Sequence, residues 1–186
     1  MFLREVVKSM KKIMNKGFTL VELLIVIALL GALAIGLIGA LDPFEQLKKG
    51  TDTGTRNNVS EMHSAIIRYY ALKGMMPWCT EDDNGLADCT GSPSGLALAS
   101  GVMVSALGRI VDSGELKANF TTVSRGDLSK IFVSGSEVAA IVCYKPTSKS
   151  FRADLNTKFN SSTHDGSVSP TDCETTDAGA CDWCVQ

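Results

Sequence analysis

The chain has 186 residues and a mass of 19.8 kDa, enough for one modest domain with appendages. Hydrophobic residues make up 45% of it and charged residues 20%, which excludes wholesale disorder. The net charge of −2 leaves no basic excess, so nucleic acid is not expected as the main partner.

Charge and hydropathy are distributed unevenly along the chain. Positions 1–17 hold five basic residues and one acidic residue, a net +4, so the remainder of this −2 chain carries −6. Leu23 to Leu41 follows as 19 residues without a charge. As a helix this run would be about 28 Å long, close to the hydrocarbon thickness of a bilayer. We therefore expect it to span a membrane, with the basic start on the cytoplasmic side.

A motif stands directly before the apolar run and reads Lys16-Gly17-Phe18-Thr19-Leu20-Val21-Glu22. An ordinary secretory signal would instead place a small-x-small cleavage site after a shorter run. The string KGFTLVELLIVIALLGALA resembles the amino terminus of type IV pilins and of the type II secretion pseudopilins. The resemblance implies that a prepilin peptidase cuts between Gly17 and Phe18, and that Phe18 is then N-methylated.

The same resemblance implies a division into three segments. Residues 1–17 would be a cleaved cytoplasmic leader, 18–41 a hydrophobic transmembrane and assembly helix, and 42–186 an extracytoplasmic head. Met10 and Met14 are alternative starts for the leader, and the sequence does not choose between them.

Glu22 is the one charge beside the apolar run, and a carboxylate there is costly unless it is paired or lies at the interface. Four residues separate it from Phe18, so the two are expected on one side of a helix. When such helices bundle with a stagger, Glu22 of one copy can meet the new α-amine of Phe18 in the next. A Glu lying passively at the membrane interface is the alternative.

Glycines interrupt the apolar run, and Gly36 to Gly39 is the weak point that we expect to unwind on assembly. Glycine costs a helix about 1 kcal/mol relative to Ala, and filament relatives often carry a helix breaker here. Close packing of intact helices around these small residues is the alternative.

The segment after the run predicts an amphipathic helix. Val59, Met62, Ile66, Tyr69 and Tyr70 recur at helical spacing, and Gly74 and Pro77 end the pattern. The polar stretch Thr51 to Asn58 favours a break, but the family resemblance overrides it. We expect one long kinked helix from about Phe18 to Lys73, whose apolar stripe faces a sheet. His63 is interpreted as a solvated helix residue.

Residues 74–101 are interpreted as loop, Leu96 to Val111 as a second helix, and Asp127 to Val133 as a short strand. Glu137 to Lys145 and the alternating segment Phe151 to Phe159 predict a hairpin. From Asn160 the chain is expected to form an irregular tail. The predicted fold class is α+β and pilin-like: a long N-terminal helix, half transmembrane, on a small antiparallel sheet with a disulfide-stabilised C-terminal region. Trp78 and Trp183 are expected to be packing residues.

Six cysteines follow the apolar run, an even number that favours disulfides in an oxidising compartment. One bridge between Cys79 and Cys89 would close an acidic loop. Cys143 would be bonded to one of three cysteines of the tail, and the spacing leaves the choice open. The rival interpretation is a zinc or redox site in the Cys-x-x-Cys pair. The tail cysteines are Cys173, Cys181 and Cys184.

The acidic loop Glu81 to Asp88 has oxygen ligands and a glycine that suit calcium, but it lacks the EF-hand spacing. A solvated surface loop is the favoured interpretation, so no metal and no cofactor is predicted.

The leading functional hypothesis is a filament subunit without enzymatic activity, since no catalytic constellation is visible. Its partners would be further copies of itself, the prepilin peptidase, the inner membrane and the pilus assembly machinery. The precursor would lie in the cytoplasmic membrane and the product in an extracellular fimbrium. A pseudopilin of a type II secretion or DNA-uptake system is the alternative. A singly anchored extracytoplasmic binding domain that never polymerises is a more distant one.

Overall fold

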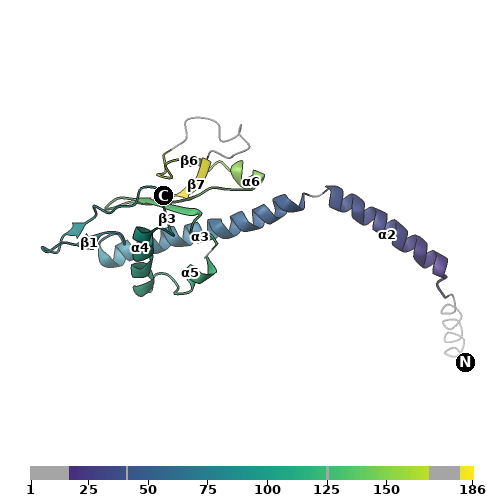
Figure 1. The fold of residues 1–186 in the computed structure, drawn as a ribbon, viewed down its shortest axis with the longest axis horizontal. Coiled ribbons are helices and arrows are strands. Elements are labelled where there is room, and N and C mark those ends of the chain that lie inside the picture. The colour runs from purple at the N-terminus through teal and green to yellow at the C-terminus, as the bar shows by residue number, and fades with distance from the viewer. Residues whose placement is uncertain (1–16, 41, 125, 168–180) are drawn as a thin grey trace, which may run out of the picture. The chain divides into compact units, whose positions relative to one another are not determined.

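The computed structural model describes residues 17–40, 42–124, 126–167 and 181–186, and it divides into two units at Pro43 and Phe44. The first unit contains the apolar helix α2, Leu20–Ala40 (Figure 1). It is rich in aliphatic residues that tolerate helical geometry, and it continues through its three glycines.

The second unit begins with helix α3, Pro43–Lys73, which is continuous through the polar stretch Thr51 to Asn58. The prediction that the helix runs through this stretch is confirmed. The expectation of one helix from Phe18 to Lys73 is wrong, because Asp42 is not helical. A residue before proline is disfavoured in the α region, whereas proline itself is tolerated in a first turn.

The predicted apolar stripe of α3 faces the core. Val59, Met62 and Ile66 are fully buried, in one cluster with residues of the sheet and of a second helix. His63 lies beside this stripe and is half-buried, so its interpretation as a solvated residue is wrong. Burial lowers the pKa of its imidazole, against a smaller opposing contribution from the backbone of Ala140.

The sheet has five strands in the order β3-β4-β5-β7-β6, and every neighbouring pair is antiparallel (Figure 1). Its strands are β3, Leu96–Ala97; β4, Ile131–Gly135; β5, Ala140–Tyr144; β6, Thr157–Asn160; and β7, Cys181–Val185. The main core lies between the sheet and the helices α3 and α4, Gly101–Asp112. A further short helix, α5, covers Phe120–Val123.

The predicted hairpin of Glu137 to Lys145 with Phe151 to Phe159 is wrong. The strand β7 lies between β5 and β6, and helix α6, Lys149–Arg152, occupies the start of the expected second strand. Leu155 is 92% exposed, so the alternating pattern there does not report a buried face. The carboxyl end is likewise not an irregular tail, because Cys181–Val185 forms a strand with four buried residues.

Other elements follow the expectations in type but not in extent. The second helix, expected at Leu96 to Val111, begins only at Gly101, because Leu96 and Ala97 pair with β4. The strand expected at Asp127 to Val133 begins at Ile131. Both tryptophans are buried, in agreement with a packing role. The α+β, pilin-like fold class is confirmed.

Two disulfides join described residues. Cys79–Cys89 closes a hairpin of β1, Thr80–Glu81, and β2, Ala87–Asp88, and Cys143–Cys184 joins β5 to β7. Cys181 is disulfide-bonded as well, and Cys173 lies outside the described residues. The zinc or redox alternative for the Cys-x-x-Cys pair is wrong for this structure, since Cys184 is bonded to Cys143.

The two bridges are expected to stabilise the head unequally, because the Cys143–Cys184 loop spans 41 residues and the Cys79–Cys89 loop 10. Removing the first by Cys143→Ala with Cys184→Ala should lower the free energy of unfolding by about 4 kcal/mol, and removing the second by about 3 kcal/mol. Denaturant unfolding of the full-length chain in detergent, followed by tryptophan fluorescence, measures both. The reverse order would show that native-state packing, not loop closure, sets the contribution.

Candidate assembly site and head pocket

The amino terminus of α2 is closed by a reciprocal pair of hydrogen bonds. The Thr19 backbone N–H and hydroxyl donate to Oε2 of Glu22 at 2.9 and 2.8 Å, and the Glu22 N–H donates to the Thr19 hydroxyl at 3.2 Å. This is a capping box, which satisfies backbone donors that a helix start leaves open. The Thr-x-x-Glu spacing before an apolar run is visible in the sequence, and the sequence analysis missed it.

The capping box fixes where helix geometry begins. Gly17, Phe18 and Thr19 have no regular secondary structure and are exposed, and α2 begins at Leu20. Phe18 therefore precedes the helix in the uncut chain, and the expectation that Phe18 and Glu22 share one helix face after cleavage stays a prediction. An exposed, non-helical Gly17–Phe18 bond is what a peptidase requires of a substrate.

Helix α2 has no covered side. The segment from Leu20 to Gly39 is long and apolar enough to cross a membrane, and none of it is buried within the structure. Large aliphatic side chains point outward all around it, with Leu20 79% and Ile35 76% exposed. Such a surface requires lipid or other copies of the helix around it. The charge of Glu22 lies at one end of this surface.

The expected weak point is helical in the isolated chain. Gly36 and Gly39 both lie within α2, and a methyl group built on either would meet no other atom. Among the described residues, no contact requires glycine at these positions. Unwinding on assembly stays a prediction.

Residues 13–38 match the family model described as the prokaryotic N-terminal methylation motif. The chain carries the prepilin-like signature of type IV pilins and pseudopilins. The chain as a whole matches no curated protein and no solved structure. The motif supports a type IV pilin-like or pseudopilin protein, and such a motif is typical of structural proteins rather than of enzymes. The motif and helix α2 together fit membrane anchoring of the precursor.

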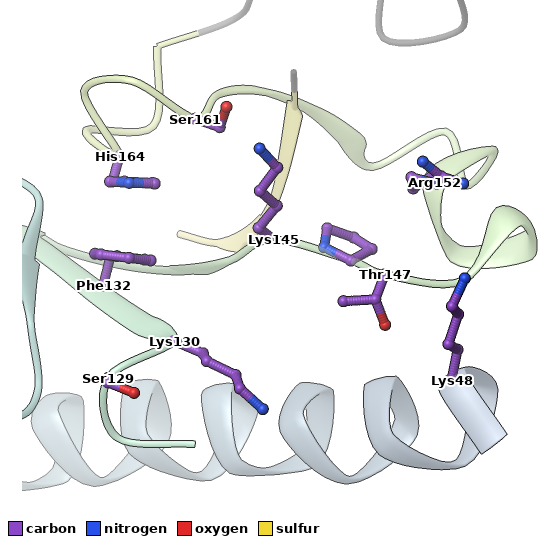
Figure 2. Close-up of a pocket in the computed structure, with 10 residues that line it drawn as sticks. Lys48, Ser129, Lys130, Phe132, Lys145, Thr147, Arg152, Ser161 and His164 are labelled. Atoms are coloured by element: carbon purple, nitrogen blue, oxygen red, sulfur yellow. The ribbon is translucent and has the colours of Figure 1, made fainter. Parts of the chain in front are cut away.

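The head contains a pocket of about 650 Å³ that the sequence analysis did not predict (Figure 2). Its cationic residues come from segments far apart in the sequence, so no local pattern marks them. It lies where β4 begins and β5 ends, next to the early turns of α3. The lining residues with basic side chains are Lys48, Lys130, Lys145, Arg152 and His164.

One wall of the pocket is an aromatic stack. The His164 ring lies over Phe132 with ring centroids 3.7 Å apart (Figure 2). His164 Nδ1 is hydrogen-bonded to Asp182. Asp182 is fully buried on β7, and burial raises the pKa of its carboxyl despite the His164 contact and nearby Lys145. The pair fixes the orientation of the imidazole at the pocket wall.

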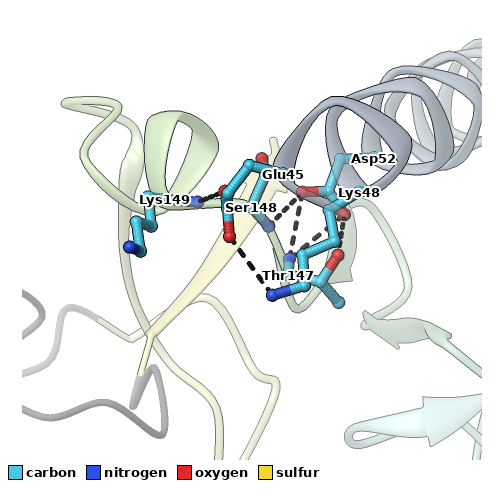
Figure 3. A network of polar contacts seen from close by, with 6 residues as sticks. All are labelled: Glu45, Lys48, Asp52, Thr147, Ser148 and Lys149. Atoms are coloured by element: carbon cyan, nitrogen blue, oxygen red, sulfur yellow. Dashed lines mark hydrogen bonds and ion pairs between the residues drawn. The ribbon is translucent and has the colours of Figure 1, made fainter. Parts of the chain in front are cut away.

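The adjoining loop is fastened to α3 by buried Asp52. Its carboxylate accepts hydrogen bonds from the Thr147 N–H at 3.0 Å, the Thr147 hydroxyl at 2.9 Å and the Ser148 N–H at 2.7 Å (Figure 3). About two turns earlier, Glu45 accepts from the Lys149 N–H at 2.9 Å, which lowers the pKa of its carboxyl. These contacts hold the loop after β5, and with it the wall at Thr147, against the helix.

Replacing Thr19 by Ala is expected to loosen the first turn of α2. The change removes the hydroxyl that both donates to and accepts from Glu22, and loss of an N-cap costs about 1 kcal/mol. Amide hydrogen exchange at Leu20 to Leu23 in detergent micelles should become about fivefold faster. Thr19→Ser keeps the hydroxyl and should exchange like the parent chain; equal rates in all three chains would contradict the capping role.

Replacing Asp52 by Ala is expected to destabilise the head by about 2–4 kcal/mol. The change removes the carboxylate acceptor of the buried Ser148 N–H and of the N–H and hydroxyl of the exposed Thr147. Denaturant unfolding of the full-length chain in detergent, monitored by tryptophan fluorescence, measures the loss. Thr53→Ala on the exposed side of the same helix is the matched control and should change stability by less than about 0.5 kcal/mol.

Proposed function

We propose that the chain is a structural subunit, a pilin, of a type IV pilus-like filament. The observation that carries the proposal is the methylation motif at residues 13–38 on a helix with no buried residue. A helix of this kind needs a different apolar environment before and after assembly. Lipid provides the first and a bundle of identical helices provides the second.

In this proposal the precursor lies in the cytoplasmic membrane with residues 42–186 outside. Prepilin peptidase removes residues 1–17 and leaves a cationic amine on Phe18, which is then methylated. The pilus assembly machinery adds the subunit to a filament that extends from the cell. The exposure of Phe18 and its position ahead of the helix support a terminal amine that is free to contact a neighbour.

Glu22 is the proposed acceptor for that amine. In the uncut chain its Oε2 serves the capping box, while Oε1 has no hydrogen-bond partner among the described residues. One carboxylate can therefore cap its own helix and bind a neighbour's ammonium group. Inside an apolar bundle an unpaired charge is strongly destabilising. The ion pair would therefore mainly fix the axial register of neighbouring helices.

The capping and pairing roles of Glu22 can be separated by substitution. Glu22→Gln keeps an acceptor for Thr19 but removes the charge, and Thr19→Ala removes the cap but keeps the charge. We expect Glu22→Gln and Glu22→Ala to be cleaved at Gly17 and yet form few or no filaments, whereas Thr19→Ala still assembles. Shearing of surface appendages followed by electron microscopy and immunoblotting measures this. Normal filaments from Glu22→Gln would refute the charge-pairing mechanism.

The pseudopilin alternative shares the same motif and helix. A strain that lacks the chain should lose a surface appendage if the chain is a pilin, but should lose protein secretion or DNA uptake if it is a pseudopilin. Mass spectrometry of purified appendages should find the chain with a methylated Phe18 at its amino terminus. An uncut chain that remains single in the membrane would contradict both and favour an anchored binding domain.

A further inference from the structure

The head presents opposite charges at opposite ends of its sheet. At one end the pocket described above gathers Lys48, Lys130, Lys145 and Arg152, with no acidic side chain in its lining (Figure 2). Two of these cations also hold acidic neighbours outside the lining: Lys48 pairs with Glu45 at 3.2 Å and Lys130 with Asp127 at 3.6 Å. The hollow is cationic although the chain beyond position 17 is acidic overall.

The other end carries the β1–β2 hairpin, which has four acidic residues and no basic one between positions 80 and 88. The hairpin is firmly built: Asp82 accepts from the N–H groups of Asn84 and Leu86, and the Cys79–Cys89 disulfide closes its base. Glu81 and Asp83 are exposed, and Glu81 contributes to the hairpin through the backbone pairing of β1 with β2. The hairpin therefore projects carboxylates without needing all of them for its own structure.

Specific contacts place the two features at opposite ends. The pocket lies beside Lys130 and Lys145, next to the paired residues Ile131 and Tyr144. The other end of the same ladder is the pair Gly135 and Ala140, four residues or about 14 Å away.

The residues that precede the β1–β2 hairpin in the chain lie against this far end of the ladder. The ring of Trp78 packs against Gly135, where any Cβ would overlap it, and its Nε1–H donates to Ser136 O at 3.1 Å. Arg109 donates to the carbonyls of Pro77 and Cys79, both at 2.8 Å. Helix α3 also separates the two features. Lys48 lies in its early turns, and about 38 Å of helix separates Lys48 from Lys73, which precedes the hairpin in the chain.

We propose that in the filament the acidic β1–β2 hairpin of one copy docks in the cationic pocket of another copy. The contact is heterologous, since two different surfaces of the same chain meet. When such surfaces lie at opposite ends of a rigid unit, repetition leads to an open filament rather than a closed dimer. The inference rests on the proposed filament function and adds a contact between heads to the packing of the α2 helices.

Charge reversal in the full-length chain tests the pairing. Glu81→Lys with Asp83→Lys reverses the hairpin, and Lys130→Glu with Lys145→Glu reverses the pocket. Each pair of changes puts like charges together and should reduce the yield of sheared filaments at least about tenfold. All four changes in one chain should restore the yield to within about threefold of the parent, because the charges are again complementary.

Matched controls separate the contact from effects of net charge and folding. Lys117→Glu with Lys158→Glu makes the same change of charge at exposed residues outside the pocket and should leave the yield unchanged. Neutral Lys130→Gln with Lys145→Gln should give an intermediate yield. Tryptophan fluorescence unfolding of each chain in detergent shows whether its head is folded.

Photo-crosslinking locates the contact without charge reversal. Leu86 is 66% exposed on the hairpin, so a benzoylphenylalanine there should be tolerated. On irradiation of cells it should bond to the peptide that contains Lys145 to Arg152 of another copy, as identified by mass spectrometry. Crosslinks to other surfaces, or none, in cells that make filaments would overturn the docking contact while the filament function stands.

The remaining outcomes are also decisive. Loss of filaments on pocket reversal but not on hairpin reversal would overturn the proposal, because the pocket would then bind a different anion. A parent chain that makes no filaments refutes the proposed function. In that case a crosslink between copies in the membrane still supports the head contact, and its absence refutes both.

Discussion

The uncovered surface of α2 is the constraint on which the rest of this protein depends. Covering a large aliphatic side chain contributes about 1.5–3 kcal/mol, so the helix from Leu20 to Gly39 represents tens of kcal/mol of unfavourable exposure in water. The core of the head is formed by its own helices α3 and α4 and its sheet. Lipid satisfies the surface without specificity, whereas copies of the same helix satisfy it with a register. Glu22, the one charge in this helix, is the residue that we propose to select that register in a bundle.

The positions that the sequence predicts well are those where one local pattern has one physical solution. The 3–4 residue spacing of Val59, Met62 and Ile66 permits only a buried helix face, and that face is buried. The motif before Leu23 combines a glycine, an aromatic residue and a glutamate in an order typical of a prepilin, and the family model for the N-terminal methylation motif matches it. The break at Asp42 was missed because the family resemblance favoured one continuous helix, whereas Pro43 disfavours helical geometry in the residue before it.

The positions that it predicts poorly depend on long-range pairing. Strand β7 lies between β5 and β6, so the partner of Val142 is Val185, far along the chain, and no period in the segment 151–159 reveals this. The pocket is similarly invisible, since Lys48, Lys130 and Lys145 are brought together only by the sheet and by the bonding of Asp52 to the loop at Thr147. Local patterns identify what each segment can be; tertiary pairing decides which segments meet.

The bonds that stabilise the head also keep its two charged ends in a fixed relation. Cys143–Cys184 joins the two central strands behind the pocket, and Cys79–Cys89 closes the hairpin at the opposite end. Asp52 fastens the loop beside the pocket to α3, the helix that continues toward the hairpin. A flexible head would let hairpin and pocket of one copy adapt separately to any partner. In the proposed filament, a head in which both are held by covalent bonds and buried polar contacts would pass the orientation of one neighbour to the next.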